Sequence, residues 1–133
     1  MNCPKCTNAA LKTVLSEEGF PLDFCPSCNG IWFDKGEAAR HFTLDSDMPN
    51  LEAALKTARK TGLKCPRCNG ELEEMKYHEQ MELLIDRCSA CAGIWFDFYE
   101  TEKLARWAAE QESPRMRLGR AVQRLRDSGY KVL

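Results

Sequence analysis

Histidine is scarce in this sequence, which contains only His41 and His78 among 133 residues. No uninterrupted apolar run approaches the length of a membrane span, about 20 residues, so we expect no membrane partner. No apolar segment typical of a secretory signal follows Met1, so we expect a cytoplasmic protein. The sequence also lacks a phosphate-binding loop and a recognisable nucleophile–base pair. It therefore predicts no enzyme, no catalytic residue and no organic cofactor site.

Cysteine, by contrast, is abundant and follows a strict pattern. All eight cysteines belong to four Cys-x2-Cys pairs, and two pairs lie in each of two similar units. The pentapeptide Gly-Ile-Trp-Phe-Asp follows the second pair of both units, so that Cys88 lies 63 positions after Cys25. Such a repeat determines the architecture before any local pattern does.

Each unit has only about 40 residues, too few to bury a sufficient core without disulfides or a metal. In a reducing cytoplasm, paired cysteine motifs favour metal binding over disulfides. We therefore assign two zinc ions to the chain, each in a closed site of four thiolates with no open position. Iron, and redox chemistry at the Cys-x2-Cys motifs, are the alternatives. The ligands assigned to the first ion are Cys3, Cys6, Cys25 and Cys28, and those of the second are Cys65, Cys68, Cys88 and Cys91.

Alternating apolar residues between the cysteine pairs predict a hairpin of two short strands in each unit. The strands are expected over residues 11–15 and 20–24, and over residues 71–77 and 82–87. Knuckles at the ends of hairpins, with a metal between them, are the layout of a zinc ribbon. Because each unit has its own ligands, we expect residues 61–112 to bind one zinc ion alone.

An Asn or Gly follows each pair closely, at a position where the knuckle must turn sharply. These two residue types accept positive φ most readily. The residues expected to do so are Asn8, Gly30, Asn69 and Gly93.

Helical patterns follow both Gly-Ile-Trp-Phe-Asp runs, over residues 36–42 and 99–111. Asp34 and Asp97 precede them, each with Glu three positions later, which indicates a capping box rather than a metal or catalytic carboxylate pair. We expect the tryptophans of the two runs, Trp32 and Trp95, to pack against the helices rather than to be exposed for recognition.

The sequence thus predicts a small α+β protein with two tandem zinc ribbons and two further helices. Residues 50–60 have helical spacing and end at Gly62, and residues 113–133 form a basic amphipathic pattern. The expected divisions are the first ribbon with its short helix (1–46, the first unit), a helical linker (47–62), the second ribbon with its helix (63–112, the second unit) and the C-terminal helix (113–133).

Charge separates the C-terminal segment from the rest of the chain. Residues 113–133 have six Lys or Arg and one Asp, whereas the other 112 residues have 13 Lys or Arg and 19 Asp or Glu. Two four-thiolate zinc sites would add further negative charge to this body, which is therefore unsuited to general phosphate binding. The basic residues beside the cysteines are expected to offset the charge of the zinc sites rather than to contact phosphate. They are Lys5, Lys64, Arg67 and Arg87.

Two kinds of partner remain open for the C-terminal segment. Its apolar stripe of Leu118, Val122 and Leu125 could be buried against the protein's own body, a protein partner or a second copy of the chain. Alternatively, its arginines could bind nucleic acid. These are Arg115, Arg117, Arg120, Arg124 and Arg126.

The motif Cys-Pro-x-Cys, followed by Cys-Pro-x-Cys-x-Gly-Ile-Trp-Phe-Asp-x-Gly-Glu, resembles the transcription-factor-IIB-type zinc-finger family. The first unit matches through Glu37, whereas the second has Ser89 for proline and Tyr99 for glycine. The resemblance covers residues 2–42 and 64–107. It implies zinc ribbons ligated by the eight cysteines and no enzymatic activity, and the family name suggests a link to transcription. We therefore expect a binding or adaptor module, with a nucleic-acid-binding regulator or a redox-sensitive zinc switch as alternatives.

Overall fold

In the part of the chain that the structure describes, seven short strands form one antiparallel sheet in the order β1-β2-β3-β7-β6-β5-β4. The computed structural model describes residues 1–17 and 19–110, so the C-terminal helix expected over residues 113–133 lies outside the described residues. The strands are β1 (Lys12–Leu15), β2 (Pro21–Phe24), β3 (Ile31–Phe33), β4 (Arg59–Lys64), β5 (Glu71–Lys76), β6 (Leu84–Cys88) and β7 (Ile94–Phe96). The helices are α1 (Glu37–Phe42), α2 (Leu51–Leu55) and α3 (Phe98–Glu110).

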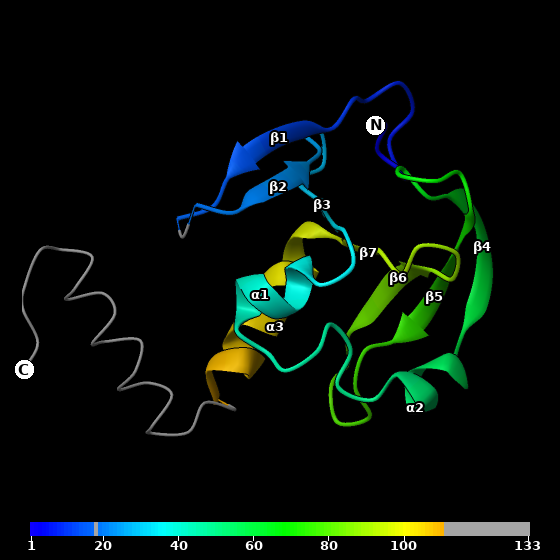
Figure 1. Ribbon diagram of the computed structural model, residues 1–133. Coiled ribbons are helices and arrows are strands. Elements are labelled where there is room, and N and C mark those ends of the chain that lie inside the picture. Colours follow the sequence, from blue (N-terminus) through cyan, green and yellow to red (C-terminus); the bar gives the residue numbers. More distant parts are fainter. Residues whose placement is uncertain (18, 111–133) are drawn as a thin grey trace, which may run out of the picture.

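The two units meet in the middle of this sheet. Strand β3 of the first unit pairs with β7 of the second, and Trp32 lies opposite Trp95 in the register. The two hairpins therefore lie at opposite ends of one sheet, with α1 and α3 between them (Figure 1). Each Gly-Ile-Trp-Phe-Asp strand therefore has one pairing partner in the other unit, and the expectation that residues 61–112 bind one zinc ion alone stays a prediction.

The sheet has a helix side and a cysteine side, because directly opposite residues of neighbouring strands share a face. Phe33 and Phe96 lie on the helix side and join one hydrophobic cluster with Leu104 of α3 and Phe42 of α1. Trp32 and Trp95 lie on the other side and join a second cluster. That cluster contains Cys3, Cys25, Cys65, Cys88 and Leu72.

The tryptophans are fully buried, with no exposed surface at either indole residue. The prediction that they pack against the helices is wrong, because both lie in the cluster that contains the cysteines. Alternation along β3 and β7 places the neighbouring phenylalanines on the helix side, so the indoles are on the cysteine side.

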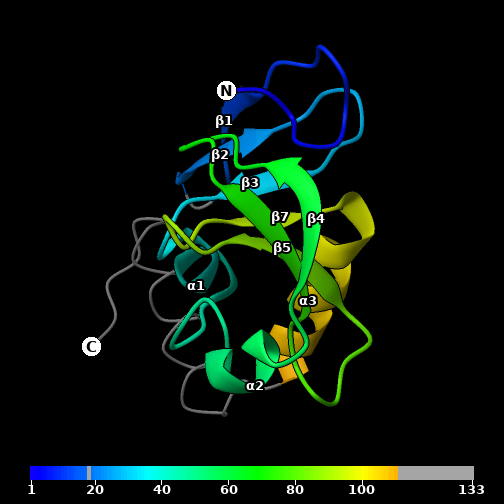
Figure 2. The same cartoon turned by 90° about the vertical axis from the view of Figure 1, so that its right-hand side faces the viewer.

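The linker between the units contains a strand that the sequence pattern missed. Helix α2 begins after Asn50, whose side-chain oxygen accepts a hydrogen bond from the N–H of Ala53 at 3.1 Å, and it ends at Leu55. The chain then enters β4, where basic residues lie opposite acidic residues of β5, with Arg59 opposite Glu74 and Lys60 opposite Glu73. Such cross-strand pairs stabilise a sheet and replace the helical continuation predicted for residues 56–60. Figure 2 shows α2 at the end of the molecule away from β1 and β2.

The remaining elements agree with the predicted hairpins and helices to within a few residues at their ends. Among residues 1–17 and 19–110, no helix is long and apolar enough to cross a bilayer.

Candidate metal centres

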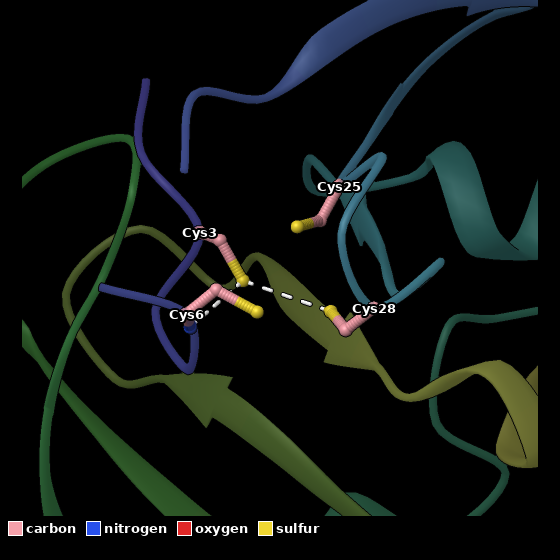
Figure 3. A group of neighbouring side chains, drawn as sticks. All are labelled: Cys3, Cys6, Cys25 and Cys28. Carbon is pink, nitrogen blue, oxygen red and sulfur yellow. Dashed lines mark hydrogen bonds between the residues drawn. The ribbon is translucent and has the colours of Figure 1, made fainter. Parts of the chain in front are cut away.

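The first group of four cysteines comes from two loops, which lie close together beside the sheet. Cys3 and Cys6 come from the N-terminal loop before β1, and Cys25 and Cys28 come from the turn between β2 and β3 (Figure 3). Their four Sγ atoms all lie within 4.8 Å of one another. The Sγ atoms of Cys3 and Cys28 are 3.8 Å apart, and the backbone N–H of Cys6 donates to the Sγ atom of Cys3 at 3.3 Å.

The second group repeats this arrangement in the second unit. Its sulfurs, from Cys65, Cys68, Cys88 and Cys91, also lie within 4.8 Å of one another. The Sγ–Sγ distance is 3.7 Å between Cys65 and Cys91, and 3.4 Å between Cys68 and Cys88. The structure thus brings together both sets of four cysteines that the spacing predicted.

These distances fit a zinc ion well. A tetrahedral site with Zn–S bonds of about 2.3 Å places its sulfurs about 3.8 Å apart, close to the spacing of Cys3 and Cys28 and of Cys65 and Cys91. Each cluster is therefore able to bind one zinc ion, with four protein sulfurs as donors.

The pKa values of the cysteine thiols depart from the ordinary value in both directions. Burial raises the pKa of Cys3 to about 12, although the N–H groups of Lys5 and Cys6 oppose this effect. Burial likewise raises the pKa of Cys65 above its ordinary value. The Cys25 thiol differs: burial raises its pKa, but the N–H groups of Cys28 and Ser27 outweigh burial and lower the pKa to about 7. A bound zinc ion would displace the thiol protons, so metal affinity is coupled to pH.

The sequence profile of the family described as "Transcription factor zinc-finger" matches residues 2–41 and 64–106. The chain belongs to this family. The two matched segments are tandem copies, and each contains one of the four-cysteine groups. No curated protein shows significant similarity to the chain. No solved structure does so either.

Each of the four knuckles turns at a residue with positive φ. In two of the knuckles this residue differs from the one that the sequence pattern predicts. Asn8, Asn29, Asn69 and Ala92 have φ values of 58°, 61°, 62° and 63°. Gly30 and Gly93, which were expected to supply this conformation, are not among the positive-φ residues of the described chain.

Gly30 and Gly93 instead provide space for the tryptophans of the other zinc-finger copy. A Cβ atom on Gly30 would lie 2.2 Å from Cζ2 of Trp95, and one on Gly93 would lie 2.1 Å from Cζ2 of Trp32. Real Cβ atoms essentially never approach so closely. Each zinc-finger copy therefore contains a glycine that the other copy requires.

Lys5 and Arg67, at the third position of the first cysteine pair in each copy, bind carboxylates of the opposite copy. The Nζ atom of Lys5 lies 2.7 Å from Oδ2 of Asp97 and 3.0 Å from Oδ2 of Asp86. Burial lowers the pKa of Lys5, but the bonds to Asp97 and Asp86 outweigh it, so the ammonium remains charged.

Arg67 makes the matching contacts in the reverse direction. Its Nε and Nη2 atoms donate to the two oxygens of Asp34 at 3.0 and 2.7 Å, and Nη2 lies 3.6 Å from Oδ2 of Asp23. Lys5 and Arg67 thus link the two copies, a role that the sequence pattern did not predict.

The aspartates at the ends of β3 and β7 bind tryptophan indoles through their side chains, and only Asp97 also stands directly before a helix, as predicted for an N-cap. Asp34 and Asp97 accept hydrogen bonds from Nε1 of Trp32 and Trp95 at 2.9 and 3.0 Å. Helix α1 begins after Gly36 without a side-chain cap. Half of the capping box does form, because Glu37 and Glu100 accept from the backbone N–H groups of Asp34 and Asp97.

Local sequence patterns do not identify the partners of Lys5 and Arg67. A signal was available, because Asp23 and Asp86 occupy the same position, two residues before the third cysteine of each unit. Repetition of a charged residue at a fixed place in both copies indicates a role that both copies share. The repeat could not show that the contact crosses from one copy to the other.

Proposed function

We propose that this chain is a non-catalytic binding module in which eight cysteines hold two zinc ions and the partner is a protein. The observation that carries this proposal is the closure of both cysteine groups, each with four sulfurs within 4.8 Å of one another. Four thiolates complete a tetrahedral zinc site, so substrate and water have no position on the metal. Domains of this family are generally structural or binding domains, which supports the same conclusion.

The proposed adaptor role places the partner contact away from the zinc sites. Lys5 and Arg67 are two of the four basic residues beside the cysteines, and both are engaged by aspartates of the other unit. Outside these ion pairs, basic residues are concentrated in residues 113–133, which have six Lys or Arg and one Asp. Arginine is enriched in protein interfaces, where its planar group pairs with carboxylates. An acidic protein surface, or a second copy of the acidic body, fits this segment.

A nucleic-acid partner is the second candidate, and the five arginines of the same segment support it. Phosphate binding releases counterions, so this affinity would fall steeply as the salt concentration rises. The acidic body would oppose such binding elsewhere on the chain.

A capture experiment with purified full-length chain and source-cell lysate tests the proposal. Lysate treated with nuclease and untreated lysate should yield the same protein partner, and the variant with Arg117, Arg120 and Arg124 changed to Gln should lose it. A variant with three exposed basic residues of the body changed to Gln removes the same charge and should retain it. These are Lys35, Lys56 and Arg106. Capture that disappears after nuclease treatment would favour nucleic acid instead, and equal loss in both variants would contradict a contact by the C-terminal segment.

The proposed compartment is the cytoplasm. The eight cysteines are free thiols in the structure, and a reducing compartment preserves thiols for metal binding.

A further inference from the structure

An open apolar hollow lies on the helix side of the first unit, beside the hairpin of β1 and β2. Its volume is about 300 Å³. Two of its lining side chains, Val14 and Phe98, have 41% and 42% of their surface exposed. The hollow is lined by Val14, Leu22, Phe24, Asn29, Ile31, Phe98 and Thr101.

The equivalent place in the second unit is filled. Leu22 of the first unit corresponds to Ile85, which lies 63 positions later, and their partners across the hairpin are Val14 and Met75. Met75 is only 1% exposed, whereas Val14 is 41% exposed. The same position of the same hairpin is therefore covered in one unit and open in the other.

The chain that follows the first unit's helix provides the cover over Met75. After α1, the linker brings Met48 and Ala54 into the cluster that contains Met75 and Ile85, and Leu51 packs against it. Helix α2 contacts β5 directly. A segment that leaves one unit's helix thus covers the other unit's hairpin.

We propose that the segment after α3, residues 113–133, covers the hollow of the first unit in the same way. The two units are related by the antiparallel pairing of β3 with β7, so the chain leaving α3 is the counterpart of the chain leaving α1. Its apolar residues Leu118, Val122 and Leu125 recur at the spacing of one helix face. The hollow has no charged side chain in its lining, so an apolar stripe of this kind suits it.

The length of the segment is sufficient to reach the hollow. Helix α3 spans about 18 Å from Phe98, in the hollow, to its last residue, Glu110, at a rise of about 1.5 Å per residue. A helix over residues 114–125 would be about 17 Å long, so a short turn at residues 111–113 would be sufficient to return the chain alongside α3. Thr101 and Ala105 follow Phe98 on one face of α3, and Glu102 is the charged residue beside them.

The inference goes beyond the proposed function, because it assigns the apolar stripe to the protein itself. Docking of the stripe turns the arginine-rich side of the segment toward solvent and any partner. The segment would then have two separate roles. Its apolar residues would hold it on the protein, and its arginines would be available to bind a partner.

Photo-crosslinking in the zinc-loaded full chain tests this directly. A benzoylphenylalanine in place of Phe98 should link to residues 114–128 within one chain, as read by mass spectrometry of the monomer. The same probe in place of Leu84, which is 48% exposed on the other hairpin, should give no such link. Val122→Asp places a charge on the apolar stripe and should reduce the link by about tenfold or more, whereas Gln123→Asp, on the other side of the pattern, should leave it unchanged.

A second pair of variants examines the hollow itself. Val14→Asp should also reduce the link, whereas Leu15→Asp, which lies on the opposite face of β1, should preserve it. Links between two chains would overturn the inference in favour of a dimer. Absence of any link to residues 114–128, or equal yields in the Val122 and Gln123 variants, would overturn it outright.

Discussion

Trp32 and Trp95 lie directly opposite one another in the pairing of β3 with β7, and each indole fits against a glycine of the other unit. Neither residue retains exposed surface. Each indole N–H donates to the aspartate two residues later, and those aspartates bind Lys5 and Arg67 from the opposite unit. The repeated pentapeptide is therefore the interface between two zinc-ribbon copies within one chain.

Replacing Gly93 with Ala should destabilise the whole protein, because the added methyl group meets the ring of Trp32. We expect a loss of about 3 kcal/mol in the free energy of unfolding, at the upper end for overpacking. Denaturant titration at saturating zinc measures it. The double variant with Trp32→Phe should lose less than the sum of the two single changes, since the smaller ring makes room. Additive losses would show that the glycine and the indole are not in contact.

Lys5→Met should cost more stability than Arg67→Met, although the two residues occupy equivalent positions. Lys5 pairs with Asp86, which is only 3% exposed, and removal of the ammonium leaves that carboxylate buried without its cation. We expect about 3 kcal/mol for this loss and about 1 kcal/mol for Arg67, whose partners are more accessible to water.

Thermal unfolding of both variants at equal zinc concentration provides the comparison. The double variant Lys5→Met, Asp86→Asn should recover part of the stability, because the amide is neutral. Equal losses in the two single variants would contradict the role assigned to the burial of Asp86.

Ala92→Asn should stabilise the second unit. Ala92 has a φ of 63°, a conformation that costs an alanine about 1 kcal/mol and that asparagine tolerates better. The other three knuckles have asparagine at their positive-φ position. We expect a gain of about 0.5–1 kcal/mol by denaturant titration, and a loss of similar size for Asn69→Ala. A destabilised Ala92→Asn protein would show that the backbone strain is not the governing factor.

Glu100→Gln should stabilise the protein at pH 8 but not at pH 5. Burial, with the charges of Asp97 and Asp86, raises the pKa of Glu100 from its ordinary value of 4.5 to about 7. The unfolded chain therefore releases this proton first as pH rises, so the carboxyl group lowers the stability progressively from about pH 4.5 to about pH 7. Glutamine can still accept the N–H of Asp97 without this ionisation cost.

The expected gain is about 2 kcal/mol at pH 8, measured as the difference between variant and parent at each pH with zinc saturating. Taking that difference removes the pH dependence of zinc binding, which both proteins share. The same gain at both pH values would show that the titration of Glu100 is not its source.

Local sequence patterns were sufficient for the hairpins, the two cysteine groups and the helices after each pentapeptide. Period-two alternation identifies a strand, and fixed cysteine spacing identifies a knuckle, without knowledge of the rest of the chain. The same patterns do not predict which strands pair with one another in the sheet. The pairing of β3 with β7 depends on contacts between residues 63 positions apart, and the glycines beside the tryptophans have a meaning only once that pairing exists.

Strand β4 was missed for a related reason. Its residues have helix-compatible spacing and few β-branched side chains, so propensity favoured a longer helix. The opposing glutamates of β5 supply the stabilisation, and those lie outside any local window. The Asp-x-x-Glu pattern predicts helix caps at Asp34 and Asp97 because the sequence does not reveal that a basic residue of the other unit approaches them.

Counting the zinc ions in the intact protein by native mass spectrometry tests the central claim most directly. The account predicts two ions per chain, because each group of four cysteine sulfurs is closed and complete. Cys25→Ser and Cys88→Ser should each reduce the count in the site to which that cysteine belongs. A count of two in the parent protein supports the assignment, and a count of one or none would contradict it.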